Sequence, residues 1–219
     1  EPKVMGIVNL TEDSFSGDGL GAQHDRALRQ AEAFIAAGVD LLDLGAESTR
    51  PGAEPVPAER ELERLLPVLE ALRGAPVPLS VDTMKPEVMR EVLRAGADLI
   101  NDVAGFRLPG AIEAVAGSDC ALCVMHMKGE PRTMQQSPAY EDVVAEVEAF
   151  LAQRTAALCA AGVARERILW DPGFGFGKTP AHNAALFRAL PRLAAHQPLL
   201  VGVSRKTMIG QITGRPVGE

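Results

Sequence analysis

The sequence predicts a (β/α)₈ barrel of the TIM type, in which seven strand–helix units are present and the eighth is missing from this chain. Three observations support this prediction. Seven short apolar runs alternate with helical patterns, the helices end in similar glycine-containing sequences, and polar residues follow the apolar runs. Unbroken alternation favours a closed barrel over an open doubly wound sheet. We therefore interpret residues 1–219 as one barrel domain that is incomplete at its C-terminal end.

Each apolar run has the length and the Val, Ile and Leu content of a strand buried on both faces, as strands of parallel sheets usually are. The runs cover residues 4–10, 40–46, 78–83, 98–102, 121–127, 168–172 and 198–204. Two of them follow near-identical helix ends, "AGVDLLD" at 37–43 and "AGADLIND" at 95–102. The chain therefore repeats one strand–helix unit, with no linker or low-complexity segment between the units.

Helical patterns fill the segments between the runs. One face of the first pattern is lined, at helical spacing, by Leu28, Ala31, Phe34 and Ile35. The second pattern has leucines on one face at positions 62, 65, 66, 69 and 72. Pro86 is placed to begin a third helix, where its missing N–H is not needed, and residues 139–161 are expected to form a long fifth one. Gly38, Gly96 and Gly162 are expected to end three helices in the left-handed conformation.

Polar residues stand at the C-terminal end of every predicted strand. In chain order they are Asn9, the segment 47–50, Asp82, Asn101 with Asp102, His126, Asp171 and the segment 204–206. In a barrel these ends meet at one mouth, where catalytic residues are expected. Thr83 and Asp102 could instead serve local turns or helix caps, and His126 is interpreted as a packed strand residue. The whole series predicts a functional site at the mouth.

The residue types at this mouth indicate what it could bind. Arg50, Arg205 and Lys206 are cations that suit a phosphate or a diphosphate. The acids and amides Asp82, Asn101 and Asp171 suit a ligand edge that presents parallel N–H donors, such as a 2-amino-4-oxo-pyrimidine. The chain has no pair of histidines with a carboxylate at ligand spacing, which argues against a transition-metal site. A Mg²⁺ ion carried by a diphosphate would need only one or two protein oxygens, and Asn9 could supply one.

The stretch "DPGFGFGKT" at 171–179 resembles a nucleotide-binding phosphate loop but does not meet its requirements. That loop needs a glycine five residues before the Gly of Gly-Lys-Thr, and the residue there is Pro172, which has no N–H to donate. The sequence therefore excludes a Walker-type nucleotide binder.

Composition narrows the function further. A net charge of −7 argues against a general nucleic-acid binder or a protein of anionic membrane surfaces, and no apolar run is long enough to span a bilayer. We therefore expect a cytoplasmic protein with small-molecule partners. Cys120 and Cys123 have Cys-x-x-Cys spacing, but they lie on a predicted strand whose positions i and i+3 face opposite sides. Together with Cys159 they are interpreted as buried hydrophobic residues.

Seven motifs, in order along the chain, together resemble dihydropteroate synthases. They are "GIVNLTEDSFS" (6–16), "DLGAESTRPGA" (43–53), "VDT" (81–83), "IND" (100–102), "MHMKG" (125–129), "DPGFGFGK" (171–178) and "GVSRK" (202–206). The resemblance implies a TIM-barrel transferase of folate biosynthesis, a sulfonamide target that acts as a cytoplasmic homodimer. It would condense 6-hydroxymethyl-7,8-dihydropterin diphosphate with p-aminobenzoate, with Mg²⁺ as cofactor.

The resemblance also implies roles for single residues on the pterin side. Asp171, Asn101 and Asp82 would hold the pterin ring, Met125 would pack against it, and Lys206 would bridge the pterin and p-aminobenzoate. The glycine-rich turn after Asp171 would form a wall of the pocket beside p-aminobenzoate rather than a phosphate cradle.

Other implied roles concern the diphosphate, the metal and the second substrate. Asn9 would coordinate Mg²⁺, and Thr49 and Arg50 would lie beside the diphosphate and the p-aminobenzoate carboxylate. Phe176 and Ser204 would lie near p-aminobenzoate. The residues implied in catalysis itself are Lys206, Arg50 and Asp82.

Two long loops, residues 11–21 and 47–55, are expected to act as lids, the first of them through Phe15, Ser16 and Asp18. The sequence departs from the family in this first loop, because Asp18 stands one position later than the family's acid. It also ends before the Arg-x-His motif that the family carries on its last strand.

Two other functions remain open at this point. A methyltetrahydrofolate-type pterin methyltransferase would share the acid and amide contacts to the pterin, but it would not need "SRK" or "ESTRPG". A non-catalytic pterin-binding subunit would keep the pocket and lack turnover, and the missing Arg-x-His motif would be its mark.

Overall fold

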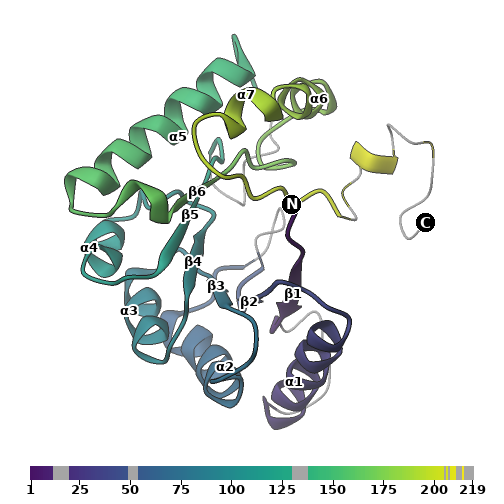
Figure 1. Cartoon of the computed structure of the whole chain (residues 1–219), viewed down its shortest axis with the longest axis vertical. Helices are drawn as coiled ribbons and strands as arrows, with labels where there is room; N and C mark the ends of the chain where they lie inside the picture. Colours follow the sequence, from purple (N-terminus) through teal and green to yellow (C-terminus); the bar gives the residue numbers. More distant parts are fainter. Residues whose placement is uncertain are drawn as a thin grey trace.

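The structure is a computed structural model that describes residues 1–11, 20–48, 54–129, 138–204, 206, 208–210 and 214. Its strands are β1 (Met5–Asn9), β2 (Leu41–Gly45), β3 (Leu79–Asp82), β4 (Leu99–Asp102), β5 (Ala121–Met125) and β6 (Ile168–Asp171). They form one sheet in the order β1-β2-β3-β4-β5-β6, and every neighbouring pair is parallel. The sheet is curved and unclosed (Figure 1).

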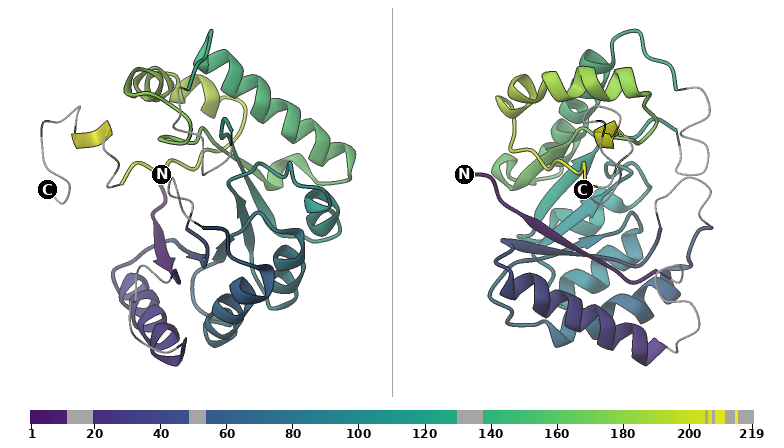
Figure 2. Two further views of the ribbon diagram at one scale, coloured as in Figure 1. Left: turned by 180° about the vertical axis from the view of Figure 1, so that it is seen from behind. Right: turned by 90° about the vertical axis from the view of Figure 1, so that its right-hand side faces the viewer.

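Helices connect the strands and lie on the outer side of the curved sheet, as Figures 1 and 2 show from three directions. They are α1 (Leu20–Ala36), α2 (Ala58–Ala71), α3 (Pro86–Arg94), α4 (Ala111–Ala116), α5 (Val143–Ala160), α6 (Pro180–Arg188) and α7 (Leu190–Ala194), with a short 3₁₀ helix, η2 (Arg165–Arg167), before β6. The predicted alternation of strands and helices is therefore confirmed.

The helix ends follow the chemistry that the sequence predicts. Pro86 is the first residue of α3, and the side chain of Asp142 caps α5 by accepting hydrogen bonds from two backbone N–H groups of its first turn. Gly38, Gly96 and Gly162 have φ angles of 85°, 104° and 96°, so each ends its helix in the left-handed region.

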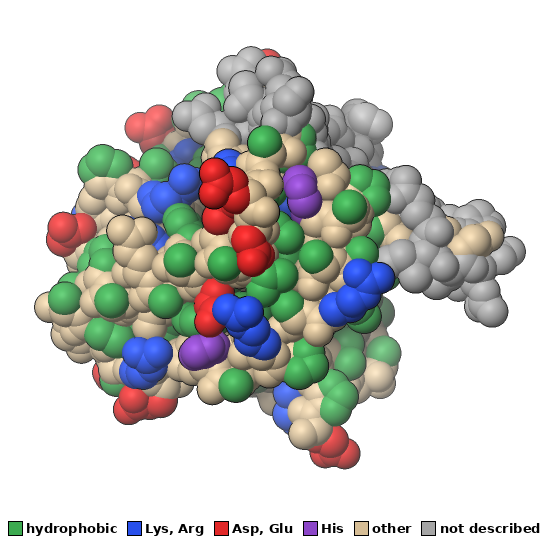
Figure 3. All heavy atoms as spheres, turned by 90° about the horizontal axis from the view of Figure 1, so that it is seen from above, with side chains coloured by type: hydrophobic (Ala, Val, Ile, Leu, Met, Phe, Trp, Pro, Cys, Tyr) green, Lys and Arg blue, Asp and Glu red, His purple; other side chains and the backbone are tan. Residues whose placement is uncertain are grey.

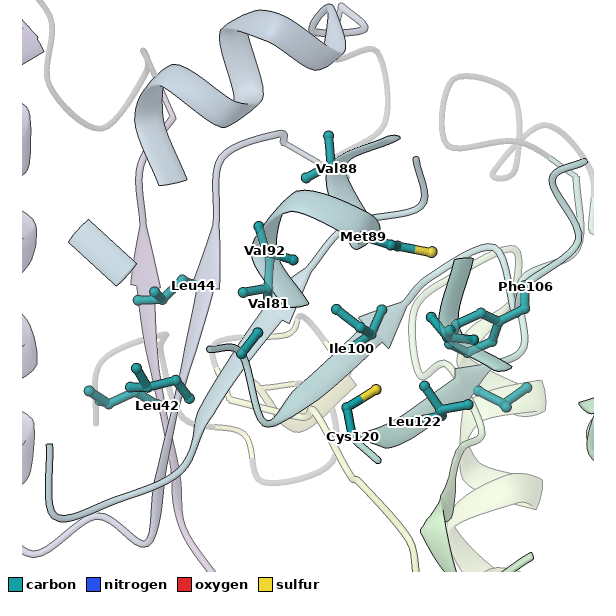
Figure 4. Close-up of a cluster of buried hydrophobic side chains, with 14 of the residues drawn as sticks. Leu42, Leu44, Val81, Val88, Met89, Val92, Ile100, Phe106, Cys120 and Leu122 are labelled. Carbon is teal, nitrogen blue, oxygen red and sulfur yellow. The ribbon is translucent and has the colours of Figure 1, made fainter. Parts of the chain in front are cut away.

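The main core lies between the outer face of the sheet and the helices. Figure 4 shows its central part, where strand side chains meet those of α3; the labelled residues there include Leu42, Leu44, Val81, Val88, Met89, Val92 and Ile100. Burying such a side chain contributes roughly 1.5–3 kcal/mol to folding, so this layer fixes the positions of the strands. The strand residues between these point to the inner face of the sheet, where the polar residues gather.

The two edges of the sheet differ from the prediction. The seventh run, residues 198–204, pairs with β6 only at its start: Trp170 donates to the Pro198 carbonyl at 2.9 Å, and Leu200 donates to the Trp170 carbonyl at 2.9 Å. β1 is not buried on both faces, because Ile7 is 50% exposed. A parallel strand is stabilised by neighbours on both sides, and the described chain supplies each of these segments with one neighbour only.

The surface above α5, α6 and α7 carries acidic and basic side chains close together (Figure 3). One such group joins Glu148 of α5 to Arg192 at 2.7 Å and to His196 at 3.1 Å. Among the described residues of this face, basic side chains therefore stand next to acidic ones instead of forming the continuous basic patch that nucleic-acid binding needs. Among the described residues, no helix has the length and apolar character required to cross a membrane.

Candidate active site

Four of the sequence-predicted site residues lie together at one end of the sheet. Asp82 ends β3 and pairs in register with Asn101 of β4, while Met125 ends β5 and pairs with Asp171 at the end of β6. The residues that alternate with them pack into the main core against the helices. The four side chains therefore lie on the inner face, at the C-terminal ends of the strands.

Asn101 contacts Asp43, which lies deeper in the barrel and is itself held by Ser80. Its Nδ2 atom lies 3.5 Å from Oδ2 of Asp43, and the other oxygen of Asp43 accepts a 2.5 Å hydrogen bond from the Ser80 hydroxyl. This orientation leaves Oδ1 of Asn101 buried, with no hydrogen-bond partner among the described residues. Because buried polar atoms are nearly always paired, this oxygen indicates a ligand that donates an N–H or O–H at the mouth.

Sequence reasoning missed Asp43 and Ser80 as parts of the site. The signal was present, since each is a polar residue inside an apolar run, two positions before the strand end in β2 and β3. Period-two alternation places them on the inner face with Asp82 and Asn101.

The carboxylates at this end of the sheet are desolvated. Burial raises the pKa of Asp171 above its usual value, although the Gly173 N–H and the Lys206 and Lys178 ammonium groups lower it in part. Burial raises the pKa of Asp82 well above its usual range, and the neighbouring Asp43 carboxylate adds to the effect. Buried acids with raised pKa values are costly to the fold and are typical of functional sites, where a ligand's N–H groups can satisfy them.

The glycine-rich turn 172–177 follows Asp171 and forms one wall of this region. Its three glycines, Gly173, Gly175 and Gly177, have φ angles of 70°, 81° and 64°, a conformation that other residues rarely adopt. Three of its N–H groups are used internally, since Gly173 donates to Asp171 at 2.7 Å, Gly175 to Asn183 at 3.0 Å and Phe176 to the Gly173 carbonyl at 3.1 Å. A phosphate cradle needs free N–H groups, so the structure supports the exclusion of a nucleotide-binding loop.

Lys206 and Phe176 stand next to each other over this turn. The Lys206 ammonium donates to the Phe174 carbonyl and lies 4.9 Å from the centre of the Phe176 ring. Burial lowers the pKa of Lys206, and the charge of Asp171 opposes that effect. Phe176 packs against a small apolar cluster of Val103, Met125 and Met127. A flat ligand that contacts Asp171 would therefore meet a cation, an aromatic ring and a thioether together.

The remaining predicted site residues are placed differently. Asn9 is exposed at the end of β1, and Ser204 is exposed in a turn. Phe15, Ser16, Asp18, Thr49, Arg50 and Arg205 lie outside the described residues. Asp102 has the local turn role that the sequence allowed, because its carboxylate accepts from the N–H groups of Ala104 and Phe106, at 2.7 Å each.

A partly buried ion-pair network that includes Glu47, shortly after β2, was not predicted. Lys85 donates to Glu47 and, at 2.8 Å, to Glu61, which is fully buried on α2. Glu47 also accepts a 2.9 Å hydrogen bond from the backbone N–H of Val56. The network therefore joins residues on both sides of the segment that carries Thr49 and Arg50.

The described residues contain no group of three or more His, Cys, Asp or Glu side chains that could hold a metal ion. Asn9 offers one neutral amide oxygen on the inner side of β1, which alternates with the core residue Val8. This donor set fits a Mg²⁺ ion held mainly by substrate phosphates, because such an ion keeps few protein ligands.

His126 lies behind the turn as a buried, neutral residue. Burial, followed by the charges of Lys178 and Arg107, lowers its pKa to about 3, and its ring packs edge-on against Phe150 at 5.0 Å. The unfolded chain binds a proton at this histidine below about pH 6.5, and the folded chain does not.

We therefore expect the contribution of His126 to the free energy of unfolding to fall as the pH decreases through this range. The raised pKa values of Asp82 and Asp171 act in the opposite direction, so the contribution is measured as a difference between the parent and a variant without this histidine. From pH 7.5 to pH 5 the loss due to His126 should be about 2 kcal/mol. Urea unfolding of the parent and of His126→Gln across this range checks the value, because the variant should lack this contribution. Equal slopes for the parent and the variant would contradict a neutral, buried His126.

Comparisons with known proteins agree with this geometry. The model of the pterin binding enzyme family matches residues 5–219. The dihydropteroate synthase of Neisseria meningitidis serogroup C is 50% identical, over 98% of this chain and 77% of the relative. Among solved structures, a sulfonamide drug complex of the Yersinia pestis dihydropteroate synthase matches with a TM-score of 0.91 and 47% identity, covering 98% of this chain and 79% of the other. The Burkholderia cenocepacia enzyme complexed with 7,8-dihydropteroate matches with a TM-score of 0.87 and 55% identity, covering 99% and 77%.

Proposed function

The chain belongs to the dihydropteroate synthase family of pterin-binding enzymes, and we propose that it condenses 6-hydroxymethyl-7,8-dihydropterin diphosphate with p-aminobenzoate to give 7,8-dihydropteroate and diphosphate. The observation that carries this proposal is the group of Asp82, Asn101 and Asp171, of which the last two are buried and Asp82 is half-buried. An amide oxygen with no partner among the described residues and two desolvated carboxylates face the same end of the barrel there.

These residues match the donor pattern of a pterin. The 2-amino group and the adjacent ring N–H of a pterin are parallel donors, which suit the Asp171 carboxylate in two charge-assisted hydrogen bonds. The unpaired oxygen of Asn101 and the carboxylate of Asp82 would accept from further N–H groups along the ring. Met125 would pack against the face of the ring from the apolar cluster that it shares with Phe176.

The second substrate would lie between the pterin and the turn 172–177. Phe176 would stand beside the aminobenzoate ring, and the Lys206 ammonium, close to that ring, would lie between the two substrates. Ser204 and Arg50 would contact the outer, carboxylate end of p-aminobenzoate, and Thr49 would lie at the diphosphate. Such an arrangement would bring the amine within attacking distance of the pterin methylene carbon.

The reaction breaks the bond between that carbon and the diphosphate oxygen, forms a bond from the carbon to the amine nitrogen, and releases one proton. As the diphosphate departs, positive charge spreads from the methylene carbon into the pterin ring. The carboxylates of Asp171 and Asp82, fixed before the reaction in a site with little water, stabilise that charge. A Mg²⁺ ion bound at the diphosphate, with Asn9 as its protein ligand, would neutralise the charge on the leaving group.

Product formation tests the function directly. The protein in its full natural length is incubated with the dihydropterin diphosphate, p-aminobenzoate and Mg²⁺, and the reaction is followed by mass spectrometry. We expect dihydropteroate and diphosphate in equal amounts, and none when p-aminobenzoate is left out. Pterin binding without turnover would favour the non-catalytic subunit, and methyl transfer from methyltetrahydrofolate to a corrinoid acceptor would favour the methyltransferase.

A further inference from the structure

The side chain of Lys178, at the end of the glycine-rich turn, has no part in the reaction described above. It is 3% exposed, and its ammonium folds back beneath the turn. The nitrogen lies 2.8 Å from the Gly173 carbonyl oxygen, 2.9 Å from the Phe176 carbonyl oxygen and 3.0 Å from Nδ1 of His126. An ammonium has three N–H donors, and here it meets an acceptor for each of them.

These contacts connect Lys178 to both sides of the candidate site. Gly173, whose carbonyl accepts from Lys178, also donates its N–H to the carboxylate of Asp171 at 2.7 Å. Phe176, whose carbonyl is the second acceptor, carries the ring that faces Lys206. A shift of the ammonium would therefore move the residue that orients Asp171 and the residue that forms the wall beside p-aminobenzoate.

Other contacts hold other residues of the turn. The Phe174 side chain is fully buried in the main core, and its carbonyl accepts from Lys206. The three glycines carry no side chains that could pack, so their positions depend on hydrogen bonds from outside the turn. The Tyr140 hydroxyl donates to the Gly177 carbonyl at 2.7 Å, and Asn183 accepts from the Gly175 N–H at 3.0 Å. Each of these polar side chains is hydrogen-bonded to one residue of the turn, whereas Lys178 is hydrogen-bonded to two.

We propose that Lys178 is a positioning residue, which fixes the turn 172–177 from beneath and thereby aims the Asp171 carboxylate and the Phe176 ring at the two substrates. The part that concerns the substrates rests on the proposed function, and the part that concerns the turn does not. The electrostatics are consistent with this role. The charge of Lys178 lowers the pKa of Asp171, and the charge of Asp171 opposes the lowering of the Lys178 pKa by burial, so each group favours the charged form of the other.

Hydrogen exchange in the ligand-free protein tests the turn without reference to activity. In the parent, the N–H groups of Gly173 and Phe176 should exchange at least about 10²-fold more slowly than an unfolded chain. In Lys178→Met, whose side chain fills the same space without donors, exchange at these two groups should rise at least about tenfold, while exchange in β5 stays within about twofold. Fast exchange in the parent, or no change in the variant, would overturn the proposal.

The second measurement, kcat/KM per folded molecule, distinguishes a positioning role of Lys178 from a purely structural one. In Lys178→Met, kcat/KM per folded molecule should fall about 10²-fold, because the catalytic geometry is loosened rather than lost. Lys3→Met, which removes a 69% exposed lysine paired with Asp40, serves as the control and should keep the parent values. A variant that is less stable but has an unchanged kcat/KM per folded molecule would assign Lys178 a purely structural role and overturn the proposal.

If Lys178→Met does not fold, Lys178→Gln gives the same comparison, since its amide keeps two N–H donors. Exchange at Gly173 and Phe176 should then rise by a smaller factor, about threefold or more, and an unchanged rate would overturn the proposal. If even the parent forms no dihydropteroate, the proposed function fails, and the exchange rates still decide whether Lys178 holds the turn.

Discussion

Replacing Asp171 by Asn is expected to lower kcat/KM at least about 10³-fold, because a site built around a carboxylate then presents an NH₂ group to the N–H donors of the pterin. The side chain keeps its shape, and its remaining oxygen can still accept from the Gly173 N–H. The thermal midpoint should therefore not fall, since the substitution also removes a desolvated charge. Dihydropteroate formation and direct binding of the dihydropterin diphosphate measure the two effects separately.

Asp98 provides a matched control at the other end of the barrel. It precedes β4, and its carboxylate accepts a 2.8 Å hydrogen bond from the backbone N–H of Leu79 at the start of β3. Asp98→Asn keeps an oxygen for that bond and lies far along the strands from the candidate site, so kcat/KM should stay within about threefold of the parent. Parent-like turnover in Asp171→Asn would contradict the assignment of Asp171 to the pterin.

Much of the fold could be predicted because its signals are local. An apolar run such as residues 121–127 is stable as a strand between two neighbouring strands. Gly96 and Gly162 can end a helix in a backbone conformation that would strain other residues. The prediction was wrong where stability depends on a neighbour. Residues 201–204 have the composition of a buried strand, but in the described chain the pairing of this run with β6 ends at Leu200.

The candidate site was predictable to the extent that topology determines it. Parallel strands place their C-terminal residues together, so Asp82, Asn101 and Asp171 could be grouped from their positions alone. Alternation also places Asp43 on this face, although the sequence analysis did not use it, whereas the contacts of Lys178 depend on the direction of a long side chain and could not be predicted. Asp43 was read as part of a strand, and Lys178 as the end of a phosphate-loop motif that fails. In the structure each is a buried hydrogen-bond partner of the candidate site.

Gly173→Ala is expected to be the most damaging of the conservative substitutions in the turn. The backbone of Gly173 has a φ angle of 70°, and a Cβ atom there would lie 1.9 Å from the carbonyl oxygen of His126. The contact involves backbone on both sides, so neither partner can rotate away. We expect a loss of about 3 kcal/mol or more in the free energy of unfolding, or a displaced turn, and in either case about 10²-fold lower kcat/KM.

Gly162→Ala separates the two causes of this loss of stability, which are backbone strain at a positive φ angle and the steric contact with His126. Gly162 has a φ angle of 96°, but a Cβ atom there would meet nothing within 4 Å, so the substitution reports backbone strain alone, at about 1 kcal/mol. The difference between the two variants, measured by urea unfolding, is then the cost of pushing the turn away from the end of β5. Because that turn orients Asp171 through the Gly173 N–H, the activity of Gly173→Ala should fall by more than its stability explains. Equal losses of unfolding free energy in the two variants would mean that the turn can move away from the end of β5 at no cost. The position of the turn would then depend on Lys178 and Tyr140 rather than on its contact with the His126 carbonyl.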